Sequence, residues 1–213
     1  MTTRSTVAAL IALAAPVIAF ANDYPTRDIR VIVPWGAGGG TDGIVRKITT
    51  LAEQNLEGAS MYVENIEGGI SATGVGQLMT SQADGYTIGA LTYDSVVTVP
   101  WQGMLPTYKM DKLKLIARIT SEPDAIIVDA NSEYATMDDL LTAAKAEPGK
   151  IRIGIQNLGG RIHLTLLQLQ ELTGTEFKVI SYPGGAAPQK EAILSDEVDV
   201  VITSLGDFSS LLE

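Results

Sequence analysis

From Tyr24 onward, short apolar runs rich in β-branched residues alternate with segments whose apolar residues recur every three or four positions. The first pattern predicts buried strands and the second predicts amphipathic helices. Strands are expected at IRVIVPW (29–35), SMYVENI (60–66), YTIGALTY (86–93), IRIGIQN (151–157), FKVISYP (177–183) and DVVITSL (199–205). Helices are expected at 41–57, near 71–82, from 136, at 160–173 and at 186–195. This order predicts parallel strands joined by right-handed crossovers.

Residues 94–114 interrupt the alternation, because their prolines and glycine predict an irregular segment. Two apolar runs follow, LKLIARIT (113–120) and AIIVDA (125–130), and we interpret both as strands that carry the chain into a second domain. The expected fold is therefore α/β, with domain 1 over 22–118 and domain 2 over 119–213. The sequence ends at SSLLE, one turn into a predicted helix, which indicates that the second lobe is truncated before it returns to the first.

The N-terminal residues have the three parts of a secretory signal peptide. MTTRST carries one arginine, VAALIALAAPVIAF is apolar, and AFA precedes Asn22 as a small-x-small cleavage site. The apolar run is shorter than the roughly 20 residues that a membrane span needs. We expect residues 1–21 to be removed on export. An exported chain with no cysteine fits the bacterial periplasm.

Composition excludes several classes of function. The formal charge of -10 and the absence of basic runs argue against nucleic acid or an anionic membrane as partner. No cysteine is present, so thiolate catalysis and cysteine metal sites are excluded. A single histidine, His163, leaves little basis for a zinc site or a histidine proton relay. We expect no metal and no cofactor.

Four glycine-containing loops each follow a predicted strand and precede a predicted helix. They are PWGAGGGTD (34–42), ENIEGGIS (64–71), IQNLGGRIH (155–163) and SYPGGAAP (181–188). Open α/β sheets bind ligands at the carboxyl ends of their strands, and free N–H groups at a helix N-terminus attract anions. Thr41 or Asp42 is expected to cap the first of these helices. The set predicts a carboxylate site built from backbone donors, although each loop taken alone also fits an ordinary tight turn.

A dinucleotide site is the alternative. Gly38, Gly40 and Gly43 satisfy G-x-G-x-x-G, and Glu64 lies 21 residues beyond Gly43, where a ribose contact is expected. Against this reading, the Pro-Trp pair lengthens the approach to the glycines, and the third glycine falls inside the predicted helix. No Lys-Ser/Thr follows, so a P-loop is excluded. The alternative function is an NAD(P)-binding oxidoreductase.

Four individual side chains have two readings each. Trp35 precedes the glycines and is either a core residue or a lid over the site. His163 is either packed or able to reach a ligand at the start of its helix. Tyr93 and Tyr182 each end a predicted strand, where their hydroxyls line a cleft or pack at a sheet edge.

Several motifs taken together resemble a known family. YPTRDIRVIVPWGAGGGTD, VENIEGG, ADGYTIGALT and SYPGGAAPQKEAILSDEVDVVI are similar to the extracytoplasmic solute receptors of tripartite tricarboxylate transporters, the TctC or Bug receptors. The similarity runs from about Tyr24 to the last residue. Those receptors are not enzymes. The resemblance implies a type II periplasmic-binding-protein fold, in which two α/β domains enclose a small carboxylate and deliver it to a membrane permease.

The resemblance also implies which positions contact the ligand. In the first domain these are Trp35, Ala37, Gly39, Thr41 and Asp42, with Ser71 and Thr92 as weaker additions. In the second domain they are Asn157, Gly160, Tyr182, Gly184, Gly185 and Ala187, with Thr203 and Ser204 as weaker additions. The implied ligand is a tricarboxylate, a dicarboxylate or a related organic acid, and the receptor is expected to be a monomer. A receptor that serves a signalling partner instead of transport is a further reading.

The sequence departs from the family pattern in places. Trp35 stands where phenylalanine is usual, and Glu67 stands where a basic residue is frequent. The loop NLGGRIH of the second domain is also unlike the usual one. Family members run to about three hundred residues, with a C-terminal segment that returns to the first domain.

Overall fold

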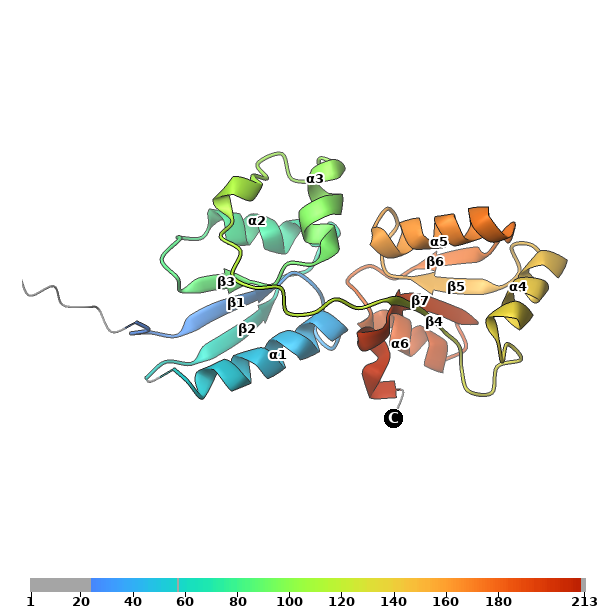
Figure 1. Ribbon diagram of the computed structural model, residues 1–213, viewed down its shortest axis with the longest axis horizontal. Coiled ribbons are helices and arrows are strands. Elements are labelled where there is room, and N and C mark those ends of the chain that lie inside the picture. The colour runs from blue at the N-terminus through green and yellow to red at the C-terminus, as the bar shows by residue number, and fades with distance from the viewer. Residues whose placement is uncertain (1–23, 57, 212–213) are drawn as a thin grey trace, which may run out of the picture.

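The computed structural model describes residues 24–56 and 58–211, and it divides them into two α/β lobes (Figure 1). Lobe 1 contains the elements up to residue 112, and lobe 2 contains those from residue 124. The elements of lobe 1 are β1 (Ile29–Val33), α1 (Gly40–Glu53), β2 (Met61–Asn65), α2 (Ala72–Thr80), β3 (Thr87–Gly89), a π-helical turn (Asp94–Thr98), α3 (Val99–Trp101) and a 3₁₀ turn (Met110–Lys112).

Lobe 1 is built on a three-stranded parallel sheet in the order β2-β1-β3. The central strand β1 reads IRVIV with almost every residue buried, because helices cover both faces of the sheet. Figure 1 shows α1 on one face and α2 and α3 on the other. The loops after β1 and β2 therefore emerge at the same edge of the sheet and face lobe 2.

Lobe 2 contains β4 (Asp124–Ile127), α4 (Met137–Ala146), β5 (Arg152–Ile155), α5 (Arg161–Thr173), β6 (Lys178–Ser181), α6 (Ala187–Leu194), β7 (Val200–Ser204) and a 3₁₀ helix (Leu205–Leu211). Its sheet has the order β4-β7-β5-β6. β7, β5 and β6 are parallel, whereas β4 runs antiparallel to β7. The strand predicted at 125–130 is confirmed as β4, although its antiparallel direction was not predicted.

Alternating side chains of β7 contribute to two cores. Val200 and Ile202 pack with Leu166 of α5 and with residues of α4, on one face of the sheet. Val201 packs with Phe208 and with residues of α6 on the other face. The two-residue period of a strand places neighbouring side chains on opposite faces, so a run that is apolar throughout identifies a strand buried on both sides.

Most of the predicted elements are confirmed, with ends that differ by a few residues. The helix predicted from residue 136 is α4, which begins with a capping box: the Thr136 hydroxyl accepts from Asp139 N, and the Asp139 carboxylate accepts from Thr136 N. α1 is shorter than predicted and stops at Glu53. Residues 209–211, which were expected to belong to a helix, lie within the 3₁₀ helix Leu205–Leu211.

Two predictions for the stretch between the sheets are wrong. Residues 113–120 form no strand, and the whole of 113–123 runs as an extended connecting segment without regular structure (Figure 1). An apolar, β-rich sequence forms a strand only when a neighbouring strand accepts its hydrogen bonds, and no described strand pairs with this one. Residues 94–101 were expected to be irregular and are helical instead.

The predicted signal peptide, residues 1–21, lies outside the described residues. Within the residues that the structure describes, none of the helices is long and apolar enough to cross a membrane.

The lobe 2 core yields a stability prediction. Leu166 of α5 is fully buried, so Leu166→Ala should lower the free energy of unfolding by about 2–5 kcal/mol through lost burial and the cavity left behind. Leu167, on the same helix, is 45% exposed, and Leu167→Ala should have a much smaller effect. Urea denaturation of both variants checks this. Equal losses of unfolding free energy in the two variants would contradict the assignment of Leu166 to the buried face of α5 and Leu167 to its exposed face.

Candidate functional site

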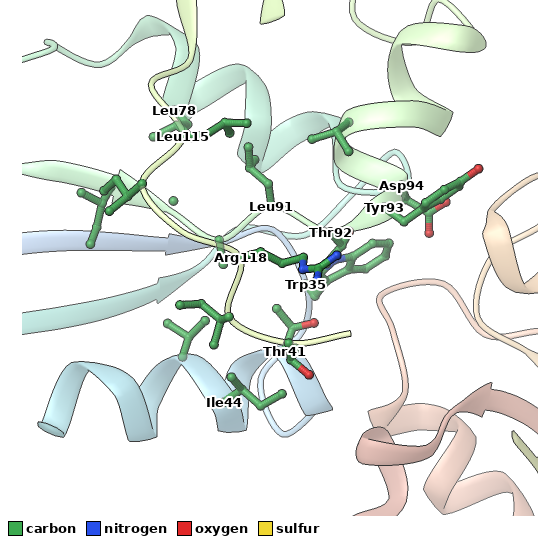
Figure 2. A pocket seen from close by; sticks show the side chains of 18 of the residues that line it. Trp35, Thr41, Ile44, Leu78, Leu91, Thr92, Tyr93, Asp94, Leu115 and Arg118 are labelled. Atoms are coloured by element: carbon green, nitrogen blue, oxygen red, sulfur yellow. The ribbon is translucent and has the colours of Figure 1, made fainter. Parts of the chain in front are cut away.

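A cavity of about 1240 Å³ extends from the junction of the lobes along lobe 1 (Figure 2). Its walls come from the β1–α1 loop, the first half of α1, residues 85–94 and the connecting segment, and lobe 2 closes one end. Ligand pockets usually have volumes of about 300–1,000 Å³, so this cavity is large enough for a small molecule. The apolar part lies along lobe 1, and the polar part lies where the lobes meet.

Trp35 belongs both to the core and to the cavity wall. Its side chain is 7% exposed and packs with Val33 and Ile70. Its indole Nε1 donates to Thr92 Oγ1 at 3.2 Å, and it lines the cavity beside Gly185 of lobe 2. Trp35 was expected to be either a core residue or a lid over the site. It packs in the core and at the same time forms a fixed part of the cavity wall.

The loop after β1 meets the loop after β6 through backbone atoms. Gly36 N donates to Gly184 O at 2.8 Å, and a Cβ built on Gly36 would lie 3.0 Å from that same oxygen. Gly40 is equally crowded, since a Cβ there would lie 3.0 Å from Asp207 Cα. Glycine at these two positions permits the close approach of lobe 2.

Asp42 fastens the β1–α1 loop but does not cap α1 as the sequence suggested. The N-cap is Gly39, with no side-chain hydrogen bond, and Asp42 lies in the first turn. Its carboxylate is buried and accepts from Gly38 N, from the Arg46 guanidinium at 2.9 Å and from Asn65 Nδ2. Burial by itself would raise the pKa of Asp42, but these hydrogen bonds outweigh it and hold the pKa below its usual value.

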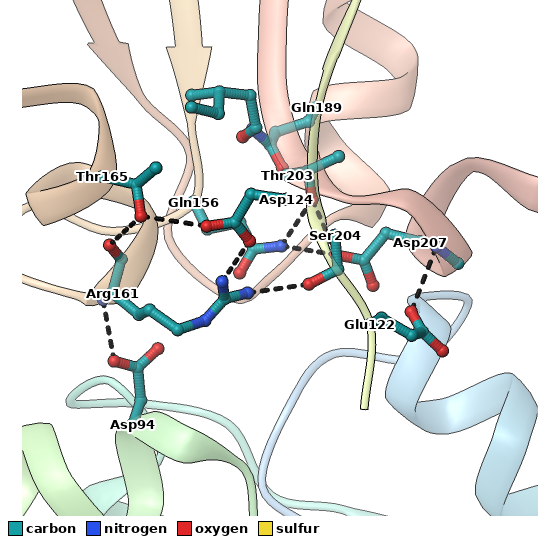
Figure 3. A network of polar contacts seen from close by, with 12 residues as sticks. Asp94, Glu122, Asp124, Gln156, Arg161, Thr165, Gln189, Thr203, Ser204 and Asp207 are labelled. Carbon is teal, nitrogen blue, oxygen red and sulfur yellow. Dashed lines mark hydrogen bonds and ion pairs between the residues drawn. The ribbon is translucent and has the colours of Figure 1, made fainter. Parts of the chain in front are cut away.

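A polar network joins lobe 2 to lobe 1 at the start of α5 (Figure 3). The Arg161 guanidinium pairs with Asp124 of β4 and donates to Ser204 Oγ at 2.7 Å. Arg161 N donates to Asp94 Oδ1 of lobe 1 at 2.9 Å. A second group of contacts joins Gln156, Thr203 and Asp207 on the neighbouring strand ends. Thr203 and Ser204 were among the predicted site residues, whereas Asp94, Asp124, Gln156, Arg161 and Asp207 were not.

The structure brings only part of the predicted set to the cavity. Trp35, Gly39, Thr41, Thr92, Gly185 and Ser204 line it. Ala37, Asp42, Ser71, Asn157, Gly160, Tyr182, Gly184, Ala187 and Thr203 do not. The ligand contacts expected for this second group stay predictions.

The residues that sequence reasoning missed share one signal. Asp94, Gln156, Arg161 and Asp207 all line the cavity and all lie within a few residues of the carboxyl end of a strand or strand-like run. The rule that directed attention to the glycine loops applies equally to them. Arg118, on the connecting segment, gave no such signal, because its segment was interpreted as a strand.

Among the described residues, Arg118 is one of three cations that line the cavity without an ion-pair partner, the others being Lys112 and Lys114. It lines the cavity and is exposed, and no described carboxylate lies within 4.0 Å of it. In Figure 2 its side chain extends toward Trp35. Arg161, by contrast, already has Asp124 as its ion-pair partner.

Two other candidates, Tyr182 and His163, do not line the cavity. Tyr182 packs against residues of α6 in the second core of lobe 2. Burial of its hydroxyl, and secondarily the nearby Glu197 carboxylate, raise the pKa of Tyr182 to about 12. His163 Nδ1 accepts from Gly159 N at 3.0 Å and so holds its own loop. Among the described residues, no cluster of three or more histidine or acidic side chains is suited to a metal ion.

The dinucleotide alternative does not fit the geometry. Gly43 lies inside α1 with open space around it, where the motif requires close helix–strand packing. Glu64, expected at a ribose, instead pairs with Arg30 at 2.7 Å. Gly40 N, a candidate phosphate donor, already bonds to Asp207.

Comparisons with known proteins agree on one family. The model of the tripartite tricarboxylate transporter family receptor matches residues 44–212. Protein BugT of Bordetella pertussis is 30% identical over 175 residues, which cover 81% of this chain and 52% of BugT. The chain therefore spans about half the length of this curated relative.

Solved structures show the same fold. A periplasmic transporter has a TM-score of 0.74 at 27% identity, with 88% of this chain and 63% of that one covered. An R. palustris protein in complex with adipate has a TM-score of 0.75 at 26% identity, with 89% and 63% covered. The expected α/β periplasmic-binding-protein fold is confirmed.

The Asp42 network yields a pH prediction. Because the folded-state pKa of Asp42 is lowered, its contribution to stability is present above the usual value near 3.8 and is lost as the pH falls through the folded-state pKa. Asp42→Asn should therefore lower the free energy of unfolding near pH 7, and by much less near pH 3. Urea denaturation at both pH values measures this. Asp111→Asn, on an exposed turn, is the control, and a loss for Asp42→Asn that does not depend on pH would refute the account.

Proposed function

The chain belongs to the tripartite tricarboxylate transporter receptor family, and from that premise we propose that it captures a small organic carboxylate between its lobes and delivers it to a membrane permease. Family receptors bind solutes and do not convert them, so the oxidoreductase alternative is set aside. The observation that carries the proposal is a cavity lined by cations without a described ion-pair partner, Arg118 among them, beside a wall of backbone and hydroxyl donors.

The polar end of the cavity suits a carboxylate. Thr41 and Ser204 present hydroxyls from the two lobes, and Arg118 offers a charge that no described carboxylate neutralises. A guanidinium binds a carboxylate through two parallel hydrogen bonds, which are among the stronger contacts available in a partly wet site. We propose Arg118 as the main charged contact, with Trp35 and Thr92 as the fixed wall behind the ligand.

The apolar end suits a hydrocarbon chain. Ile44 and Ile48 of α1, Leu78 of α2 and Leu115 of the connecting segment line this part (Figure 2). Burial of each methylene group contributes about 0.8 kcal/mol, so an acid with an aliphatic body gains from this wall. The related adipate complex contains such an acid, which supports a linear aliphatic carboxylate as the class to test first.

Location and movement follow from the same proposal. We propose a periplasmic receptor, as for the related periplasmic transporter structure, that works with permease subunits of the tripartite type. The proposed domain boundary, 22–118 and 119–213, falls in the connecting segment 113–123, which is the one covalent crossing between lobes in the described residues. Because this segment has no regular hydrogen bonds to break, we propose it as the hinge.

Arg118→Gln tests the proposal. It should weaken adipate binding by about tenfold or more, because a charge-assisted pair contributes roughly 1.5–3 kcal/mol. Isothermal titration of the purified chain measures the affinity. Lys47→Gln, on the exposed side of α1, removes the same charge away from the cavity and should leave the affinity unchanged.

A panel of linear dicarboxylates, monocarboxylates and uncharged diols of equal length completes the test. Binding of the acids alone supports the proposal. Equal binding of the diols, or an unchanged affinity of Arg118→Gln, would overturn the assignment of a carboxylate to this cation.

A further inference from the structure

Two helices from opposite lobes begin at the junction between the lobes. α1 starts after Gly39 in lobe 1, and α5 starts after Gly160 in lobe 2; neither N-cap residue uses a side chain to bond its helix. The free N–H groups of a helix N-terminus, together with the macrodipole, favour a negative charge there. α1 has Asp42 in its own first turn and α5 has no acid there, and each helix start also receives a carboxylate from the other lobe.

Asp207 of lobe 2 supplies the carboxylate for α1. Its Oδ1 accepts from Gly40 N at 3.0 Å, which is the first residue of α1. Its Oδ2 accepts from Thr203 Oγ1 at 2.6 Å and from Gln156 Nε2 at 2.7 Å (Figure 3). The side chain is thus held on both oxygens and directed across the junction.

Asp94 of lobe 1 supplies the carboxylate for α5. Its Oδ1 accepts from Arg161 N, the first residue of α5, at 2.9 Å and from Thr98 Oγ1 at 2.6 Å. Asp94 is only 7% exposed, yet its Oδ2 has no hydrogen-bond partner among the described residues. Asp94 lines the cavity, so this second oxygen is available to the cavity while the first one holds the start of α5.

The two contacts are reciprocal, since each lobe inserts an acid into a helix start of the other. We propose that Asp94 and Asp207 are specificity-determining residues of the cleft. They occupy the two helix N-termini that a ligand carboxylate would otherwise take, they hold the lobes together when no ligand is bound, and an acidic ligand binds by displacing them. The identity of the ligand rests on the proposed function; the contact between the lobes does not.

The test compares the chain with the double variant Asp94→Ala/Asp207→Ala. Small-angle X-ray scattering without ligand measures separation of the lobes, and titration with adipate measures affinity. We expect a larger radius of gyration and about tenfold tighter adipate binding, the size of one charge-assisted hydrogen bond. Asp111→Ala/Glu171→Ala removes two exposed acids that do not line the cavity, and it should change neither quantity.

Gly40→Ala opens one contact by a second route. A Cβ at this position would collide with Asp207 Oδ1. The variant still contains both Asp94 and Asp207. It should also enlarge the radius of gyration, and far-ultraviolet circular dichroism equal to that of the parent chain verifies that the variants fold.

The outcomes separate the inference from the function on which it builds. An unchanged radius of gyration in the double variant and in Gly40→Ala overturns the contact between the lobes. Expanded scattering with unchanged or weaker adipate binding overturns the competition but leaves the receptor proposal intact. Expanded scattering with no acid bound by any variant, the parent chain included, supports the contact and contradicts the proposed function.

Discussion

The close approach of the two lobes through main-chain atoms is the constraint on which the cleft depends. Gly36 donates to Gly184 O, and Gly40 lies against Asp207 with no space for a side chain. Any larger residue at these positions would hold lobe 2 away, and Trp35 would lose its neighbour Gly185. The glycine-rich loop therefore controls distance between lobes as much as it supplies donors.

Electrostatics at the junction follow from that distance. The chain carries a formal charge of -10, yet the lobes meet through acids, because each acid faces helix amides and not another carboxylate. The two arginines that line the cavity differ in their ion pairing. Arg161 is neutralised by Asp124, whereas Arg118 has no described ion-pair partner. A net-acidic receptor can thus keep one local site that attracts anions.

Local chemistry was enough to predict most of the fold. The apolar runs at 29–35 and 199–205 were predicted as strands and form β1 and β7, and the helix predicted from residue 136 is α4. The stretch 113–120 has the composition of a strand but lacks a partner, and partners are supplied by distant parts of a chain. Asp42 is a second example of a role set by distant residues. Its carboxylate bonds to Asn65 and Arg46, and it does not cap α1.

The sequence by itself determined the two α/β units, the loops that end their parallel strands and the family to which the chain belongs. The units and loops depend on periodicity and turn chemistry, which act over a few residues, whereas the family was indicated by the resemblance of several motifs. The tertiary structure alone decided which of those loops face one another, that Asp94 and Asp207 reach across the junction, and that Arg118 is left unpaired in the cavity. Such pairings join residues far apart in the chain, and only the packing of the two lobes fixes their distances.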